Sequence, residues 1–258
     1  MTNESRCLLA AECRLAGQPA HCNNHCTAFI ATRGRSNSAN LPQRYRLTTL
    51  GNSPAAADQA PIYKQLAAYA ATFDRQYPDA MQARVDELAA KGIDAERAQV
   101  KSMYLWSQSP GTGKTTTAAA LLNEWLRASL MGAVKRGRQA PQQPAMFLDI
   151  NEWQSDYNLA TMTNDDAGMA QVQATLKRAQ AVDFLVIDDI GIRDATPAFK
   201  AYVHAIINAR CAGAKPTVYT SNLPLEQMER VFDARLFDRM RDMCTVYKFE
   251  GTSHRGGK

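Results

Sequence analysis

The feature that most constrains this chain is a glycine-rich segment between an apolar run and a helical pattern. Residues 108–115 read Gln-Ser-Pro-Gly-Thr-Gly-Lys-Thr. The residues before it, 100–106, are typical of a β-strand. Those after it, 115–130, carry an apolar stripe at helical spacing, and we expect this helix to stop near Gly132. A strand, a glycine-rich turn and a helix in this order predict a phosphate-binding loop at a helix N-terminus. The alternative is a chance glycine-rich turn.

Each residue type in this loop has a chemical role. Main-chain N–H groups can surround a β-phosphate, Lys114 can bridge the β- and γ-phosphates, and the Thr115 hydroxyl can bind Mg²⁺. The predicted ATP contacts are Ser109, Pro110, Gly111, Thr112, Gly113, Lys114, Thr115 and Thr116. The full pattern has a glycine where this chain has Gln108. Because that position precedes the phosphate nest, we expect ATP binding to survive.

A second segment, residues 183–191, reads Asp-Phe-Leu-Val-Ile-Asp-Asp-Ile-Gly. Four apolar residues followed by two acids predict a buried parallel strand that carries carboxylates at its end. Buried carboxylates are costly unless they are paired or bind a cation. We therefore expect Asp188 to hold Mg²⁺, directly or through water, and Asp189 to polarise an attacking water. Residues 217–220 predict another strand. It is followed by Asn222, which can sense a γ-phosphate or belong to an ordinary turn.

The other patterns alternate between helices and strands, which is typical of the α/β class. We expect strands over residues 145–150 and 245–249, and helices over 61–73, 79–90, 151–162, 169–180, 197–211, 225–232 and 234–241. This alternation predicts a mostly parallel sheet with helices on both faces. Residues 31–60 are rich in Ser, Asn, Pro and Ala, and predict a linker and the lead-in to the main domain.

Cysteines crowd the start of the chain. Four of the six are Cys7, Cys13, Cys22 and Cys26, with His21 and His25 among them. In a reducing compartment metal binding is more natural than a disulfide framework. Four thiolates, or three with one histidine, would suit tetrahedral Zn²⁺. Because residues 1–40 are too few to bury a core, we expect the metal to supply folding energy. A disordered cysteine-bearing tail and a redox sensor are the alternatives.

Composition adds weaker constraints. The 258 residues suffice for one large α/β domain with a small appendage, and the net charge is +5. Basic residues cluster in 1–46, in 133–138 and near the C-terminus, where they can follow a phosphate backbone or form an ordinary solvated surface. We find neither a secretory signal nor an apolar stretch of membrane-spanning length, and therefore expect a cytoplasmic protein without membrane contact.

The order of these motifs resembles the DnaC/DnaI-type replicative helicase loaders, which are AAA+ ATPases. The likeness runs over residues 41–256, through the phosphate loop, Val-Ile-Asp-Asp-Ile-Gly, Thr-Ser-Asn, Arg-Leu-Phe-Asp-Arg-Met-Arg and Phe-Glu-Gly-Thr-Ser-His-Arg. It implies an AAA+ core over 41–258 without a C-terminal lid domain. The cysteine-rich residues 1–40 look like the zinc-binding, helicase-contacting N-terminal domains of DnaI-type loaders. A phage-encoded loader fits this resemblance.

The resemblance also implies roles for particular residues. Lys114 and Thr115 match the loop lysine and the Mg²⁺ ligand, Asp188 and Asp189 the acidic pair, and Asn222 the first sensor. Arg239 matches an arginine finger, with Arg235 a nearby candidate. Arg255 matches an arginine that faces nucleotide or a neighbouring subunit, and Arg193 and Lys200 are candidate DNA contacts. The implied partners are a hexameric replicative helicase, single-stranded DNA and further copies of this chain.

An arginine finger requires assembly, because it completes a neighbour's site and can raise the rate about 10³–10⁵-fold. Asp189 stands where many AAA+ proteins have glutamate, which favours slow turnover. Two other functions stay open. One is an IstB-type transposition helper, which shares the ATPase core. The other is a nucleotide-dependent switch that binds DNA and a partner with little hydrolysis. The cysteine-rich start favours the loader.

Overall fold

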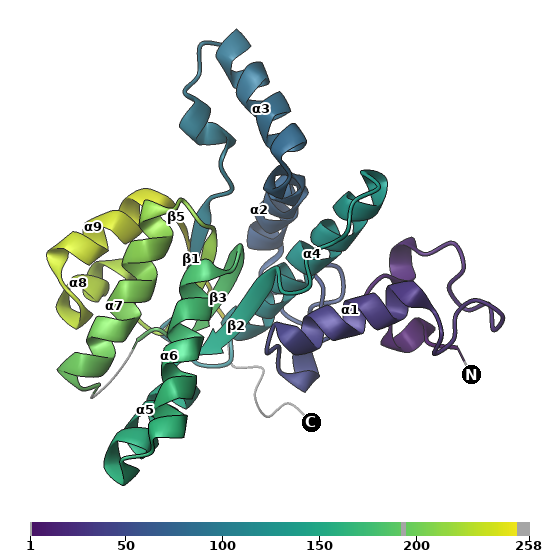
Figure 1. Ribbon diagram of the computed structural model, residues 1–258. Helices are drawn as coiled ribbons and strands as arrows, with labels where there is room; N and C mark the ends of the chain where they lie inside the picture. Colours follow the sequence, from purple (N-terminus) through teal and green to yellow (C-terminus); the bar gives the residue numbers. More distant parts are fainter. Residues whose placement is uncertain (1, 192–194, 252–258) are drawn as a thin grey trace.

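A parallel β-sheet forms the centre of the computed structural model, which describes residues 2–191 and 195–251 (Figure 1). The strands are β1 (Ser102–Trp106), β2 (Ala145–Asp149), β3 (Phe184–Asp188), β4 (Thr217–Ser221) and β5 (Cys244–Lys248). They lie in the order β2-β3-β4-β1-β5, and every neighbouring pair is parallel. The predicted α/β class with a parallel sheet is confirmed.

Alternate strand residues supply two cores, one on each face of the sheet. On one face Phe184 and Val186 pack against α4 (Lys114–Lys135) and α2 (Ala60–Ala70). On the other face Leu185 and Ile187 pack beneath a second group of helices. These helices are α5 (Ile150–Thr163), α6 (Asp166–Ala181), α7 (Pro197–Ala212), α8 (Met228–Val231) and α9 (Ala234–Met243). Both faces are covered, as the alternation of strands and helices predicts.

Polar caps fix where three helices begin. Asp149, Thr196 and Asp233 precede α5, α7 and α9, and each side chain accepts hydrogen bonds of 2.8 to 3.2 Å from main-chain N–H groups of its helix. Such a cap contributes about 1 kcal/mol. Asp149 is also the last residue of β2, so its capping role holds a carboxylate at the same sheet edge as Asp188.

The predicted stop at Gly132 is wrong, because α4 continues to Lys135. Gly132 is instead required by packing. A Cβ atom there would lie 2.3 Å from Cε2 of Tyr77, whose hydroxyl donates to the Ser129 carbonyl. Tyr77 directly precedes α3 (Pro78–Ala90), which stands away from the sheet at the top of Figure 1 and packs mainly on short 3-10 turns.

The predicted linker over 31–60 is wrong in part, because residues Thr27–Ser38 form helix α1. The N-terminal segment, residues 2–40, lies against the α4 side of the molecule (Figure 1). Leu8 and Ala39 belong to the core of that face, and the Ala39 carbonyl accepts from Phe147 N at 2.7 Å. Glu12 forms an ion pair with Arg127 of α4. Separate domains divided at residue 40 stay a prediction.

Short 3-10 turns connect these elements: Glu4–Arg6, Ala10–Glu12, Gln43–Tyr45, Ala71–Gln76, Ala95–Ala98 and Leu225–Gln227. None of the helices within the described parts of the chain combines the length and apolar character that crossing a membrane requires.

Candidate nucleotide-binding site

The phosphate loop connects the end of β1 to the start of α4. Gly111 and Gly113 have φ angles of 76° and 94°, in the left-handed region that glycine adopts without strain. A Cβ atom on Gly113 would lie 2.4 Å from Cβ of Ala55, so the packing also requires glycine there. Gly113 is the N-cap of α4, and no side chain caps this end. The first N–H groups of α4 are thus available to an anion.

Lys114 lies inside the loop. Its side chain is 8% exposed, and Nζ donates to the carbonyl oxygens of Ser107 and Ser109, both at 3.3 Å. These long hydrogen bonds hold the ammonium beside the loop centre. Thr112 is also buried, and its hydroxyl has no partner among the described residues. An unpaired buried hydroxyl is costly, which favours a polar ligand at this loop.

The acidic pair lies at the end of β3, next to β4. Burial raises the pKa of Asp188 to about 6, while hydrogen bonds from the hydroxyls of Thr220 and Thr115 act in the opposite direction. Thr220 Oγ1 donates to Asp188 Oδ1 at 2.6 Å and accepts from the Asp189 N–H at 2.9 Å. One hydroxyl therefore holds both acidic residues.

Asp189 has a φ of 59°, an uncommon conformation for a residue with a side chain. Its carboxylate is held from both sides. Asn151 Nδ2 donates to one oxygen at 2.9 Å, and Asn222 Nδ2 donates to the other at 3.2 Å. The two amides fix the direction of the carboxylate, so Asn222 lies beside the acidic pair as the sequence predicts.

One cavity of about 460 Å³ joins the loop to the acidic strand end. Its lining includes seven predicted loop residues and three residues from the strand ends: Pro110, Gly111, Thr112, Gly113, Lys114, Thr115, Thr116, Asp188, Asp189 and Asn222. Ser109 does not line it but accepts from Lys114. The spatial grouping expected from the sequence is thus present.

The cavity also includes residues that the sequence patterns did not indicate: Arg44, Tyr45, Pro54, Ala55, Asp149, Asn151 and Thr220. Asp149 has the same local signal as Asp188, a polar residue at the end of an apolar strand, and could have been found. Arg44 and Tyr45 have no such signal. They reach the cavity because the chain folds back over the loop, and the Arg44 guanidinium lies 4.6 Å from the centre of the Tyr45 ring.

Comparison with known proteins finds similarity over part of the chain. The family model described as IstB-like ATP binding protein matches residues 153–258. Over 138 residues the chain is 30% identical to the replicative helicase loader DnaC of Escherichia coli strain K12, a match that covers 54% of this chain and 49% of DnaC. The phage-like element PBSX protein XkdC of Bacillus subtilis strain 168 is 29% identical over 143 residues, covering 54% of this chain and 46% of XkdC.

The fold agrees with these relationships. A crystal structure of the DnaC helicase loader matches 81% of this chain and 100% of its own chain, with a TM-score of 0.51 and 18% identity. The chain is thus similar to IstB-like ATP binding proteins over residues 153–258 and to DnaC over about half of its length. It spans about half the length of the curated relatives it matches.

Three described basic residues with predicted roles lie outside the cavity at the phosphate loop. Arg235 and Arg239 are on α9, the first exposed and the second half-buried, and neither lines the cavity. Lys200 is in the first turn of α7 and is half-buried. Arg193 and Arg255 lie outside the described residues. An arginine that is remote from its own nucleotide site can still act in a neighbour's.

Oxygen donors suitable for magnesium are present in the cavity at the phosphate loop. The Thr115 hydroxyl and the Asp188 carboxylate lie next to each other, as their hydrogen bond shows. Mg²⁺ prefers few protein ligands of this kind together with waters and substrate phosphates. The residues therefore fit a phosphate-bound Mg²⁺, which would neutralise charge on the triphosphate.

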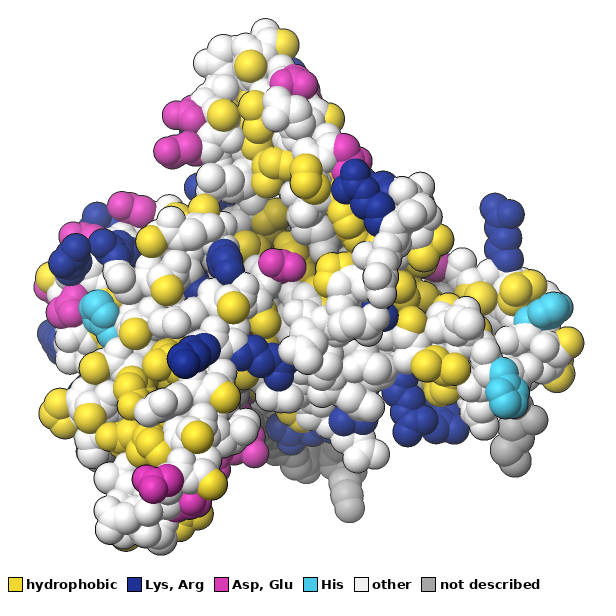
Figure 2. All heavy atoms as spheres, in the orientation of Figure 1, with side chains coloured by type: hydrophobic (Ala, Val, Ile, Leu, Met, Phe, Trp, Pro, Cys, Tyr) yellow, Lys and Arg dark blue, Asp and Glu magenta, His cyan; other side chains and the backbone are white. Residues whose placement is uncertain are grey.

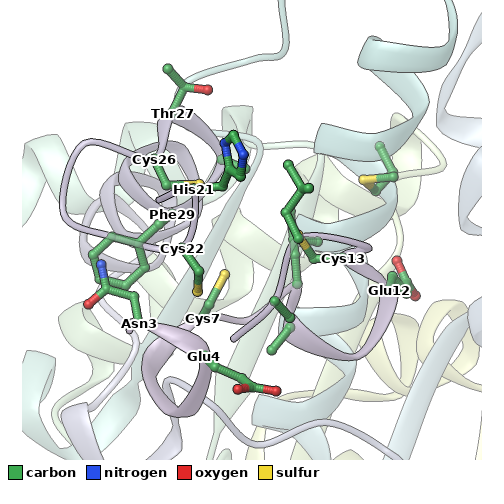
Figure 3. Close-up of a pocket in the computed structure, with 16 residues that line it drawn as sticks. Asn3, Glu4, Cys7, Glu12, Cys13, His21, Cys22, Cys26, Thr27 and Phe29 are labelled. Carbon is green, nitrogen blue, oxygen red and sulfur yellow. The ribbon is translucent and has the colours of Figure 1, made fainter. Parts of the chain in front are cut away.

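The four N-terminal cysteines lie apart from the phosphate-loop cavity, around a separate pocket of about 300 Å³ on the N-terminal segment (Figure 3). In Figure 3 the Cys7 and Cys22 side chains point toward each other, while Cys13 and Cys26 lie on different sides of the pocket. Burial raises the pKa of Cys7, and the other three thiols add to this effect.

The predicted zinc centre is not supported. Of the residues that the structure describes, no three or more His, Cys, Asp or Glu side chains are grouped to hold a metal ion. The set Cys7, Cys13, Cys22 and Cys26, with His21 or His25 as alternates, has suitable donor chemistry. The four thiols line one pocket without closing on a common centre. The N-terminal segment is held instead by packing on α4, where Leu9 contacts the cluster around Leu130.

Proposed function

We propose that this protein is an ATP-dependent loader of a replicative DNA helicase onto single-stranded DNA, acting as an assembly with ATP bound between subunits. The observation that carries the proposal is the single cavity in which the phosphate loop meets Asp188 and Asp189. The relationship to DnaC supports the choice of helicase loading among AAA+ activities.

The cavity suggests how each residue acts on ATP. The triphosphate lies over the uncapped start of α4, and Lys114 exchanges the carbonyls of Ser107 and Ser109 for phosphate oxygens. Thr115 and Asp188 would hold Mg²⁺, which would stabilise the charge that develops on the γ-phosphate. Asp189, fixed by its two amide donors, orients the attacking water.

Arginine from a neighbouring subunit completes the site in this proposal. The cavity holds Lys114 and Arg44 but none of the three arginines of α9. Arg239, with Arg235 as the alternative, acts on the next subunit's γ-phosphate in this proposal. A separate chain should then hydrolyse ATP slowly, and no step of the proposal uses zinc.

Multiple-turnover ATP hydrolysis tests the proposal, measured alone, with single-stranded DNA, and with a hexameric helicase from the same replication system. We expect slow basal turnover that increases with DNA and helicase. We also expect the wild-type protein, but not Lys114→Ala, to place the helicase on a single strand in an unwinding assay. Efficient unwinding with Lys114→Ala would contradict ATP-dependent loading.

Two alternative functions are each favoured by a specific observation. The family model supports an IstB-type transposition helper, because its description names IstB-like ATP binding. The two amides that engage Asp189 support a nucleotide-dependent switch with little hydrolysis. Stimulation by a transposase rather than a helicase would select the first. Tight ATP binding without turnover, with DNA and partner present, would select the second.

A further inference from the structure

A second cavity, distinct from the nucleotide site, is lined by three arginines. It has a volume of about 250 Å³ and lies between α1, the first 3-10 turn and the turn Gln43–Tyr45. Arg6, Arg33 and Arg46 reach it from these three segments. The rest of its lining is Leu8, Phe29, Thr32, Ser36, Gln43 and Leu47. Among these lining residues, all of which the structure describes, there is no acid.

The sequence of α1 explains how the cavity forms. Phe29, Thr32, Arg33 and Ser36 have the i, i+3, i+4, i+7 spacing of one helix face. Phe29 is buried and forms part of the floor, and the Arg6 guanidinium lies 6.0 Å from the centre of its ring. Arg33 on the same face is exposed, so its charge lies at the cavity mouth.

These arginines differ from many others in the chain. Arg84, Arg127, Arg136 and Arg241 form ion pairs with carboxylates, and Arg35, Arg178 and Arg210 donate to main-chain carbonyls. Across the described parts of the chain, none of the three cavity arginines forms an ion pair. Arg46 makes one long hydrogen bond, of 3.4 Å, to the Leu41 carbonyl. Three like charges around one cavity repel each other unless an anion binds between them.

We propose that this cavity binds phosphate groups of a single-stranded nucleic acid. A planar carboxylate can be satisfied by one guanidinium fork, whereas the oxygens of a tetrahedral phosphate accept from several directions. Three guanidinium groups from separate segments therefore suit phosphate better than an acidic peptide. Figure 2 shows basic side chains spread along the edge below α1, a distribution that suits an extended nucleic-acid strand better than a single free anion.

The arginine cavity is connected to the nucleotide cavity through residues 43–47. Gln43, Arg46 and Leu47 line the arginine cavity, while Arg44 and Tyr45 between them line the nucleotide cavity. A ligand that orders this turn in one cavity changes the surface of the other. By thermodynamic linkage, if bound nucleotide increases the affinity for the nucleic acid, bound nucleic acid increases the affinity for the nucleotide by the same factor.

The expected effect follows from counterion release. Each phosphate contact on a single strand contributes about −0.7 to the slope of log K against log salt concentration, so three contacts contribute about −2. Between 50 and 200 mM salt this corresponds to about a twentyfold loss of affinity. Replacing all three arginines by alanine should remove this part of the slope.

The experiment measures fluorescence anisotropy of a labelled oligothymidylate with the full chain across that salt range. We compare wild type, Arg6→Ala/Arg33→Ala/Arg46→Ala, the same triple change to lysine, and Arg14→Ala. Arg14 is exposed in the same segment and does not line the cavity, so it serves as the control. We expect a slope shallower by about 2 for the alanine triple, and wild-type slopes for the control and the lysine triple.

Parallel slopes for wild type and the alanine triple would overturn the proposal. So would full competition by polyglutamate, which indicates an acidic-peptide site, or by inorganic phosphate at matched ionic strength, which indicates a free-anion site. The inference rests on the DNA-binding part of the proposed function. Binding of a fluorescent ATP analogue to the same proteins separates the two. Wild-type ATP binding with unchanged slopes removes only this inference, whereas no ATP binding by wild type removes the proposed function.

Discussion

Replacing Thr220 by valine should weaken Mg²⁺ binding at the acidic pair. Valine preserves the shape of threonine but removes the hydroxyl that donates to Asp188 at 2.6 Å and accepts from the Asp189 N–H at 2.9 Å. The pKa of Asp188, already raised by burial to about 6, should rise further, because the lost bond favours the charged form. Asp189 loses the contact that holds its uncommon backbone conformation.

The magnitude follows from the lost charge-assisted bond. Hydrogen bonds to charged groups contribute about 1.5–3 kcal/mol. At about 1.4 kcal/mol per factor of ten, the Mg²⁺ concentration that gives half-maximal ATP hydrolysis should rise about tenfold to hundredfold. Turnover at saturating Mg²⁺ should also fall, because the Asp189 carboxylate is less well directed.

The assay is steady-state ATP hydrolysis as a function of Mg²⁺ concentration. Thr161→Val is the matched control, because Thr161 is exposed on α5 and its hydroxyl donates to a carbonyl of its own helix. Thermal unfolding of both variants checks that each is folded. A Mg²⁺ dependence of Thr220→Val equal to wild type would refute the claim that this hydroxyl organises the acidic pair.

Three further predictions test packing, assembly and the support of the loop. Gly132→Ala should lower the free energy of unfolding, measured in urea, by about 1–3 kcal/mol, because the new methyl group clashes with Tyr77. The control is Gly34→Ala on α1, whose new methyl group contacts no other atoms, and this change should not destabilise the protein. Arg239→Ala should bind ATP but not hydrolyse it, and mixing it with Lys114→Ala should restore activity; a mixture as inactive as its components rules out action on a neighbour's site. Tyr63→Phe removes a buried hydroxyl that is hydrogen-bonded to the hydroxyls of Ser53 and Thr117. Because the Thr117 hydroxyl also donates to the Gly113 carbonyl, this change should lower the free energy of unfolding by about 1–3 kcal/mol and weaken ATP binding. An unchanged urea midpoint would contradict it.

Local signals explain which parts of the site can be predicted from the sequence. Glycines followed by a lysine, and carboxylates after an apolar run, indicate their own positions, so the sequence alone predicts that Lys114 and Asp188 share one site. Asp149 has a weaker form of the same signal, because it is a single acid after its strand. Arg44 and Ala55 have none, because their place at the cavity depends on a fold-back of the chain that no local pattern encodes.

Tertiary packing explains the failures in the fold. Glycine commonly ends helices, but at Gly132 the approach of Tyr77 requires glycine inside a helix. The composition of residues 31–60 indicates a linker, yet α1 continues to Ser38, and the buried Phe29 and Ala39 anchor this helix near α4. The cysteines supply the right donors for zinc, but spacing alone does not bring four thiols to one centre.

We propose that one triphosphate is held by the loop and by the acidic strand end together. Isothermal titration calorimetry of a non-hydrolysable ATP analogue, with and without Mg²⁺, tests it most directly on wild type, Lys114→Ala and Asp188→Ala. We predict that Lys114→Ala loses binding in both conditions. Asp188→Ala should bind the analogue normally without Mg²⁺ and lose the gain in affinity that Mg²⁺ gives the wild type. A full Mg²⁺-dependent gain in Asp188→Ala would contradict the account.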